Sequence, residues 1–450
     1  MTSFLDQRTP RIVPLQSKAW ISLTPQTLFA ALAEIPSLFW LDSGDSADGW
    51  SYIGYGPARR LSSAALLSLA AYSIDDDKLI VRNDLPPFHS GILLQLNYPA
   101  GDAPFRLSKA LVYSALRAYR FDTILAYTHA RKAWFCVSNA QHGSNRQFRE
   151  SLEEIELFFL NRNHPKYQSE VPKNGPVHSP IDLHYFCAIQ RALDYIRAGD
   201  VYQINISKFF AAPWQNSSAD LYLEMRSISP PSYGAYLGPA IAPDGRAICC
   251  ISPELFLRVL RNEVLTRPIK GTRPLGSTPD ETSAARRDLE SSLKERAELN
   301  MIVDLERNDL GRVCRDGSVR VISSGEVDQL PTLFHRTATV SGQLCPGTTL
   351  GELLAATFPG GSVTGAPKIR AMQIIAELER EPRGPYCGAI GWFGCNGLEL
   401  NLAIRTAIVD NARREARYFA GSGIVADSDP EKEHAETVLK AAPFFGAVRR

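Results

Sequence analysis

The sequence lacks the cysteine pairs, long apolar runs and one-sided charge that mark several large protein classes. Its 450 residues include eight cysteines with no CxxC pair, which favours reduced, buried thiols over disulfides or a zinc site. The longest apolar runs, such as residues 64–71, fall far short of the ~20 residues that span a bilayer. Lysine and arginine (49) balance aspartate and glutamate (48), which leaves no basic field for nucleic acid or an anionic membrane. We therefore expect a small-molecule ligand, with no nucleic-acid or membrane partner.

A secretory signal is also missing. Residues 1–11 mix Asp, Gln, Arg and Pro where a signal peptide would carry an apolar core, so we expect a cytoplasmic protein. The chain exceeds the ~250–300 residues at which one hydrophobic core usually stops growing. Because residues 161–180 are polar and proline-rich, we predict an N-terminal region, 1–160, a linker, 161–180, and a C-terminal region, 181–450.

Helical and strand-like patterns alternate in the C-terminal region. Apolar residues recur at helical spacing over 183–196, and Gly199 ends that pattern. In residues 201–207 apolar and polar side chains alternate, which predicts a strand with a polar face toward a cleft or solvent. A capping box at 278–281 precedes a long helical region that includes residues 295–312.

Three glutamates on two of the predicted helices form a candidate metal site. Glu298 lies on an apolar helix face, where an unpaired carboxylate would be costly to bury. Glu433, Glu436 and Lys440 share one face of a helix near the C-terminus. A few hard carboxylate oxygens suit a Mg²⁺ ion that also binds water and an anionic substrate. The alternative is a set of surface charges paired with neighbouring basic residues.

Two glycine-rich segments can bind an anion. Residues 360–368, GGSVTGAPK, place a glycine-rich turn before a helix, where free backbone N–H groups bind anions. The Gly-Lys-Ser/Thr of a nucleotide-binding P-loop is missing there. The GSG at 421–423 can form a backbone nest for a carboxylate. Either segment can equally be a plain turn.

Two basic side chains stand out by their positions. Arg405 lies among apolar neighbours, where a guanidinium usually meets a carboxylate of a ligand or of the protein itself. Lys270 follows a strand and precedes Gly271, so its amine can project from a turn into a cleft and act as a nucleophile. The simpler interpretation is a solvated lysine.

Six motifs occur in an order that a known family shares. They are ISPE (251–254), PIKGTRP (268–274), AELNMIVDLERNDLGR (297–312), GGSVTGAPK (360–368), NLAIRT (401–406) and GSGIVADSDPEKEHAET (421–437). Together they resemble the chorismate-utilising enzymes: anthranilate synthase component I, aminodeoxychorismate synthase component I, isochorismate synthase and salicylate synthase. The resemblance covers about residues 180–445. It implies an α+β fold of the anthranilate synthase component I type, with large antiparallel sheets packed as a sandwich and helices outside.

Position 270 separates the two members that the chain resembles most. The family motif usually reads PIAGT in anthranilate synthases and PIKGT in aminodeoxychorismate synthases, and here it is PIKGT. The resemblance therefore implies an amino-group transferase that aminates chorismate at C4, giving 4-amino-4-deoxychorismate for 4-aminobenzoate and folate biosynthesis. The alternatives are amination at C2, as in anthranilate synthase component I, and a non-catalytic, tryptophan-binding relative.

The ammonia for such a reaction has to come from outside the chain. A glutaminase elbow, Gly-x-Cys-x-Gly, is missing, since Cys395 has Phe393 two residues before it. The resemblance implies a stand-alone synthase subunit that forms a heterodimer with a glutamine amidotransferase or takes up free ammonia.

The resemblance also implies roles for single residues. Lys270 resembles the nucleophile, Glu254 the general acid or base, and His335 the histidine near the departing C4 hydroxyl. The implied Mg²⁺ ligands are Glu298 and Glu436, with Glu433 as a third or outer carboxylate. The implied substrate contacts are Gly271, Thr272, Thr364, Tyr386, Arg405, Gly421, Gly423 and Lys440.

A tryptophan pocket is implied for the first half of the chain. WLDSGDSADGWS (40–51) resembles the N-terminal region of the two aminating members, and the candidate pocket residues are Ser43, Ser51, Pro231 and Tyr233. However, ISPPSYGAY (228–236) departs from the usual Asn-Pro-Ser-Pro run, which leaves feedback control open. The alternative is that the Ser, Gly and Asp residues at 42–49 form ordinary turns.

Overall fold

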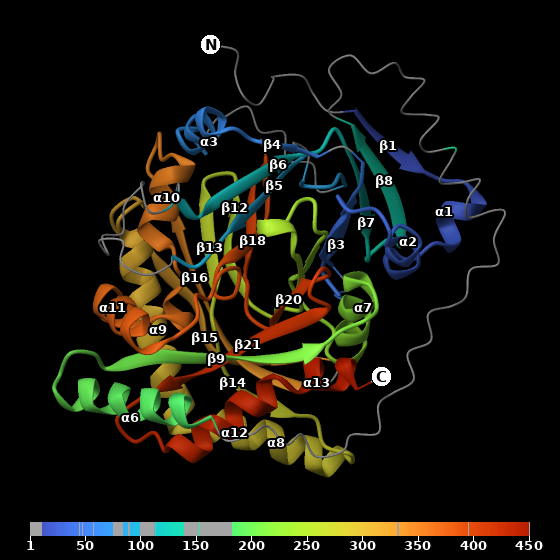
Figure 1. The fold of residues 1–450 in the computed structure, drawn as a ribbon. Helices are drawn as coiled ribbons and strands as arrows, with labels where there is room; N and C mark the ends of the chain where they lie inside the picture. Colours follow the sequence, from blue (N-terminus) through green and yellow to red (C-terminus); the bar gives the residue numbers. More distant parts are fainter. Residues whose placement is uncertain are drawn as a thin grey trace.

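The computed structural model describes most of the chain outside its termini and a few internal segments. The described residues are 11–44, 46, 48–56, 58–74, 84–88, 91–99, 112, 114–138, 153, 182–330, 333–394 and 396–449. The predicted linker, 161–180, lies outside them. Two large antiparallel sheets with helices outside form an α+β fold (Figure 1), as predicted.

The first sheet has eleven strands among the described residues, in the order β1-β8-β7-β3-β2-β10-β11-β20-β21-β9-β17. In that order their bounds are Arg11–Leu15, Ala133–Ser138, Thr123–Thr128, Trp50–Gly54, Phe39–Asp42, Gly234–Leu237, Ala247–Cys250, Thr406–Asp410, Glu415–Ile424, Gln203–Pro213 and Gly365–Ala366. The pairing of β2 with β10 joins the two predicted regions within this sheet.

The second sheet follows the order β14-β16-β13-β12-β19-β18-β5-β6-β4, and β15 pairs with β16 beside this path. The bounds are Ile269–Pro274, Leu333–Gln343, Glu263–Arg267, Leu255–Leu260, Gly397–Leu402, Ala389–Gly394, Ile92–Leu96, Leu116–Arg120, Arg59–Arg60 and, for β15, Arg320–Gln329. Because β5 pairs with β18, this sheet too contains strands from both regions. The division of the chain at 161–180 stays a prediction.

Helices cover the outside of the sheets (Figure 1). The described α-helices are α1 (Lys18–Ser22), α2 (Pro25–Ala31), α3 (Ser63–Ala70), α6 (Leu183–Arg197), α7 (Ser218–Ile228), α8 (Pro279–Ser291), α9 (Leu293–Gly311), α10 (Leu350–Thr357), α11 (Lys368–Leu378), α12 (Pro430–Lys440) and α13 (Ala442–Val448), and 3₁₀ turns span Pro243–Gly245 and Gly361–Val363. The predicted long helical region is two helices, α8 and α9, because Ser292 leaves helical geometry and its hydroxyl caps α9 by accepting the Glu295 N–H.

The predicted strand at 201–207 opens β9, which pairs with β21 from Ile204 to Pro213. Ile204 and Ile206 are buried in the apolar core, as the alternation predicts. Gln203 and Asn205 on the opposite face are buried as well, and their side-chain oxygens accept no hydrogen bond within the described residues. The polar face of this strand is therefore buried inside the protein and is not exposed to bulk solvent.

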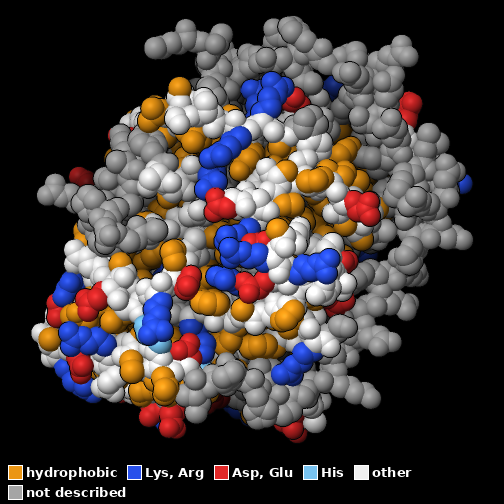
Figure 2. Space-filling model, in the orientation of Figure 1, with side chains coloured by type: hydrophobic (Ala, Val, Ile, Leu, Met, Phe, Trp, Pro, Cys, Tyr) orange, Lys and Arg blue, Asp and Glu red, His pale blue; other side chains and the backbone are white. Residues whose placement is uncertain are grey.

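The surface and the thiols agree with the composition. Basic and acidic side chains intermingle on the face that Figure 2 shows. The cysteines within the described part of the chain are free thiols, most of them buried. No described helix combines the length and apolar character needed to cross a bilayer.

Candidate functional site

Lys270 lies within strand β14, at an irregularity in its pairing with β16 and not on the predicted turn, where the two sheets approach each other. Its side chain is 14% exposed, and its Nζ atom is 3.9 Å from Glu298 Oε2 of α9. A Cβ atom added to Gly423 of β21 would lie 3.3 Å from the same Nζ atom. The amine from the second sheet thus reaches the backbone of the first sheet, next to a carboxylate.

Gly271 is a glycine because a helix packs directly against it. Its φ is +88°, and an added Cβ would lie 1.5 Å from Glu295 Oε2 and 2.8 Å from a methyl group of Leu289. Any side chain would therefore be strained by the positive φ, and the ends of the Glu295 and Leu289 side chains would have to move to admit it. This packing explains the residue without a ligand, and its contact with substrate stays a prediction.

Glu254 is a buried acid with a near-neutral pKa. Ser362 Oγ donates a hydrogen bond to Glu254 Oε1 at 2.8 Å. Burial raises the pKa of Glu254 to about 7, while Ser362, Lys270 and the Ile269 N–H lower it. A carboxyl group that titrates near pH 7 can both give and take a proton under ordinary conditions.

His335 of β16 is a neutral ring that lies opposite Thr272 of β14, two residues from Lys270. Its Nδ1 atom is 2.9 Å from Thr272 Oγ1, and its Nε2 atom has no hydrogen-bond partner within the described residues. Burial, and then the positive charge of Arg405, lower the pKa of His335 to about 3. The ring can therefore donate or accept a hydrogen bond but carries no charge near neutral pH.

Arg405 makes no ion pair among the described residues. Its backbone is in the left-handed region, with φ +50°, and one guanidinium nitrogen is 3.4 Å from Ser229 Oγ. Burial lowers its pKa, which Tyr418 and Glu254 partly offset. No internal salt bridge to a described residue occupies this side chain, so among these residues the guanidinium is available to an anionic ligand.

Two of the three predicted metal-binding carboxylates face each other. Burial raises the pKa of Glu298, and the Glu436 carboxylate raises it further. Glu436 pairs with Lys440 at 2.7 Å, and this partner outweighs burial and lowers its pKa. Glu433 is buried and instead accepts a 2.7 Å hydrogen bond from Ser428. No group of three or more His, Cys, Asp or Glu side chains within the described ranges is arranged to hold a metal ion.

The GSG segment is neither a nest nor a turn. Residues 421–423 lie within β21 and pair in regular register with β9, Gly421 opposite Ser207 and Gly423 opposite Asn205. The idea of a backbone nest is therefore wrong, because these residues are extended strand paired on one side with β9. Lys440 Nζ donates to the Gly421 carbonyl at 2.9 Å, which ties α12 to this strand.

A buried lysine at the end of the GGSVTGAPK segment anchors it through hydrogen bonds to a carboxylate and to the backbone just before it. Lys368 donates to Asp309, and to the carbonyls of Thr357 and Pro359 at 3.0 and 2.8 Å. The hydroxyl of buried Thr364 donates to the Gly360 carbonyl at 2.9 Å. Sequence reasoning missed this role of Lys368, because a lysine at the start of a helix gives no signal of burial.

Tyr386 lies in the apolar core. Its ring stacks on Phe419 with centroids 5.5 Å apart, and the residue is 4% exposed. Burial raises the pKa of its hydroxyl well above the usual range. Its contact with substrate stays a prediction, as do those of Thr272, Thr364, Gly421 and Gly423.

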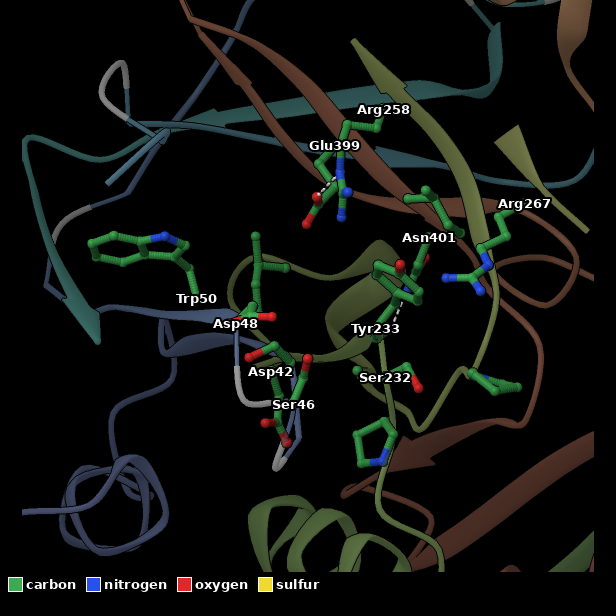
Figure 3. Close-up of a pocket in the computed structure, with 18 of the residues that line it drawn as sticks. Asp42, Ser46, Asp48, Trp50, Ser232, Tyr233, Arg258, Arg267, Glu399 and Asn401 are labelled. Atoms are coloured by element: carbon green, nitrogen blue, oxygen red, sulfur yellow. Dashed lines mark hydrogen bonds and ion pairs between the residues drawn. The ribbon is translucent and has the colours of Figure 1, made fainter. Parts of the chain in front are cut away.

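A cavity of about 1000 Å³ opens between the sheets and contains most of the predicted tryptophan pocket (Figure 3). Ser43, Pro231 and Tyr233 line it, whereas Ser51 lies behind Ser43, with its hydroxyl 3.4 Å from that of Ser43 and 2.9 Å from His129 Nε2. The lining continues to His335. The candidate effector pocket and two neighbours of Lys270, Ile269 and His335, therefore line one continuous space.

Two ion pairs on the wall of this cavity were not predicted. Arg258 binds Glu399 at 2.6 Å and Arg267 binds Asp328 at 2.8 Å. Figure 3 shows Arg258 and Glu399 on the side of the cavity opposite Asp42 and Asp48. The partners of each pair lie far apart in the sequence. The sequence alone therefore gives no sign that they form ion pairs, which only the structure reveals.

Comparisons with known proteins agree with this geometry. Residues 39–446 match a family model described as chorismate binding enzyme. Anthranilate synthase component 1 of Thermus thermophilus is 42% identical, covering 94% of this chain and 95% of that protein. Aminodeoxychorismate synthase component 1 of Bacillus subtilis is 37% identical, covering 71% of this chain and 68% of that protein.

Solved structures share the fold over nearly the whole chain. Anthranilate synthase component I from Streptococcus pneumoniae superimposes with a TM-score of 0.66 and 27% identity, covering 97% of this chain and 92% of that one. The menaquinone-specific isochorismate synthase of Escherichia coli superimposes with a TM-score of 0.71, covering 99% and 97%, and its 17% identity makes this a likeness of fold alone.

Proposed function

Because the chain belongs to the family of chorismate-binding enzymes, we propose that it is a synthase subunit that aminates chorismate at C4 to give 4-amino-4-deoxychorismate. The observation that carries this proposal is the Lys270 amine, held between the sheets 3.9 Å from Glu298. A lysine at this position is the feature by which the sequence resembles aminodeoxychorismate synthases, which supply 4-aminobenzoate and folate biosynthesis. A lysine with a merely structural role would normally extend its charged amine into solvent, whereas this side chain is largely buried.

In the proposed reaction Lys270 is the nucleophile. Its neutral amine adds to C2 of chorismate, the two ring double bonds shift, and the C4 hydroxyl leaves as water. Ammonia then adds at C4, the double bonds shift back, and the bond between C2 and the lysine nitrogen breaks, while the surplus proton on the C4 nitrogen returns to Glu254. Glu254 gives the proton to the departing hydroxyl, and neutral His335 hydrogen-bonds the same region of the ring.

Charged groups bind the substrate dianion. Arg405, which has no ion-pair partner within the described residues, is proposed to bind the enolpyruvyl carboxylate. Enzymes of this family generally use Mg²⁺, and Glu298 and Glu436 are proposed to hold it, with Glu433 as an outer carboxylate. Burial and the nearby Glu436 carboxylate raise the pKa of Glu298, and a bound cation would relieve this repulsion. When bound, the ion supplies positive charge to the ring carboxylate.

The proposed metal site has a direct test. Chelation should abolish turnover, and Glu436→Gln should weaken Mg²⁺ binding by tenfold or more in calorimetry. Full activity in excess chelator would contradict the assignment. Glu431→Gln is the matched control, because Glu431 is an exposed residue in the first turn of the same helix but lies on a different face from Glu433 and Glu436.

A glutamine amidotransferase subunit is the proposed source of ammonia. The described site contains an amination nucleophile, and the chain lacks a glutaminase elbow. The purified chain should use ammonium but not glutamine. Hydrolysis of glutamine by the chain alone would overturn the need for a partner.

Anthranilate synthase component I is the second candidate. Several relatives of this name match nearly the full chain, one of them at 42% identity. The two functions differ in product. Incubation with chorismate, ammonium and Mg²⁺, with and without added aminodeoxychorismate lyase, should yield para-aminobenzoate only when the lyase is present. Direct formation of ortho-aminobenzoate would overturn C4 amination.

A further inference from the structure

The GGSVTGAPK segment places a serine hydroxyl on the acid of the proposed reaction. Ser362 lies in the 3₁₀ turn Gly361–Val363 and is 7% exposed, and Glu254 is 5% exposed. The 2.8 Å bond from Ser362 Oγ to Glu254 Oε1 is the one hydrogen bond that this carboxyl group receives from a side chain of the described residues. The proposed reaction uses Glu254 but leaves Ser362 without a role.

Three buried side chains fix the backbone on both sides of Ser362. Each donates a hydrogen bond to a carbonyl of the turn or of the residues just before it. The bonds run from Lys368 to Pro359 at 2.8 Å, from Thr364 to Gly360 at 2.9 Å and from Arg383 to Val363 at 2.8 Å. Because the backbone is held before and after the serine, its hydroxyl is held against Glu254.

Glu254 is held at its own backbone as well. Its N–H donates to Ser252 Oγ at 3.1 Å, and its carbonyl accepts from the Leu402 N–H at 3.0 Å. Ser252 Oγ in turn donates to the Leu402 carbonyl at 2.6 Å. Both partners of the Ser362–Glu254 bond are therefore fixed in place before any substrate binds, which is the arrangement that preorganised catalytic groups need.

We propose that Ser362 is a positioning residue, whose hydroxyl holds the Glu254 side chain and stabilises the carboxylate that remains when Glu254 gives its proton to the departing C4 hydroxyl. The inference rests on the proposed function. A hydroxyl binds a carboxylate more strongly than a neutral carboxyl group, so this hydrogen bond strengthens as the proton leaves. It weakens again when the surplus proton of the C4 nitrogen returns to Glu254. Ser362 thus acts through Glu254 and touches no reacting atom.

The surroundings of Glu254 give this one hydrogen bond a large effect. Burial raises the pKa of Glu254 to about 7, and the Ser362 hydroxyl opposes burial more than Lys270 does. Without this donor, the acid would hold its proton more tightly and give it up less readily. The serine therefore keeps Glu254 in the range where it can both give a proton and take it back near neutral pH.

An infrared titration of the chain without substrate or metal tests the effect on Glu254 directly. The C=O stretching band of protonated Glu254 is the band that Glu254→Gln removes, and in the wild type it should disappear with a midpoint near pH 7. Ser362→Ala should move this midpoint up by about one unit, and so should Ser362→Cys, whose thiol fills the space but donates weakly. Ser218→Ala is the matched control, because it removes a buried hydroxyl that binds Tyr236 instead, at 2.9 Å. An unmoved midpoint in both Ser362 variants would overturn the inference.

Kinetics then separate a positioning role from a merely structural one. At pH 6, with chorismate and Mg²⁺ but no ammonium, Ser362→Ala should slow formation of the Lys270 adduct about three- to tenfold and leave chorismate affinity unchanged, because the proton is only partly transferred in the transition state. In the Glu254→Gln background the same change should slow it no further. Equal slowing in both backgrounds would contradict a role through Glu254. If the wild-type chain forms no adduct, the proposed function fails, while the infrared midpoint still shows whether Ser362 stabilises the carboxylate.

Discussion

A single amine decides which ring carbon the enzyme is expected to aminate. Lys270→Ala should abolish covalent labelling by chorismate and lower C4 amination about a thousandfold or more. Intact-mass and peptide mass spectrometry check the first result, and product analysis the second. Because the change creates the PIAGT motif, residual activity should move toward ortho-aminobenzoate.

The matched control is Lys294→Ala. Lys294 is 52% exposed and its Nζ atom lies 4.0 Å from the other oxygen of Glu298. Removing this second amine beside the same carboxylate should leave the adduct intact. If the Lys270→Ala variant aminated chorismate at C4 at the wild-type rate, Lys270 would be shown to have only a structural role.

The burial of Glu254 predicts a characteristic pH dependence. Its folded pKa of about 7 exceeds that of an unfolded glutamate, so the folded state binds more protons and loses stability as pH rises toward 7. Between pH 5.5 and 8 this loss should be about 2 kcal/mol, and Glu254→Gln should remove it. Urea unfolding at the two pH values checks this, and an unchanged pH dependence in the variant would exclude the raised pKa.

Sequence motifs reveal part of the candidate site, whereas the rest becomes visible only when the structure shows which side chains are buried. Lys270, Glu254 and Arg405 are recognisable because their motifs are specific to a family. Lys368 is not, because its hydrogen bonds to Asp309 and two carbonyls form only where it is buried, which sequence spacing does not encode. The proximity of Glu298 and Glu436 is likewise a property of two helices that are distant in sequence.

The contact between β14 and α9 makes the strand around Lys270 sensitive to a change at Gly271. Gly271→Ala should destabilise the protein by about 2 kcal/mol, because it displaces the Glu295 side chain from its ion pair with Arg273 and adds backbone strain at positive φ. Gly317→Ala is the control, with φ +69° and no atom within 4 Å of the added Cβ. It should cost only the strain, about 1 kcal/mol. Equal melting temperatures for the two variants would contradict the packing argument.

Local pattern predicts elements better than it predicts their environment. The helical spacing of 183–196 and the alternation of 201–207 correspond to α6 and the start of β9. The break at Ser292 was not predicted, since helical spacing continues across it. The GSG segment was misread because glycines favour turns, whereas its pairing with β9, over two hundred residues away, makes it a strand.

The large cavity predicts an effector at the level of the whole molecule. Ser43, Pro231 and Tyr233 line it together with the aromatic rings of Trp50 and Trp392. We expect calorimetry to detect tryptophan binding, and Tyr233→Ala to weaken it at least tenfold. Leu67→Ala, an exposed apolar residue on α3, is the control. Absence of heat with the wild-type chain would contradict the assignment.

The interleaving of strands from both halves of the chain has a consequence for how the protein is made. Strand β2 can pair with β10, and β5 with β18, only after the later strand has been synthesised. For β5 the partner strand follows almost three hundred residues later in the chain. Until then the nascent chain exposes unpaired strand edges, a state that invites aggregation and recruits chaperones. Fragments cut at 161–180 would keep those edges permanently open, so the two halves should become soluble only when they are produced together.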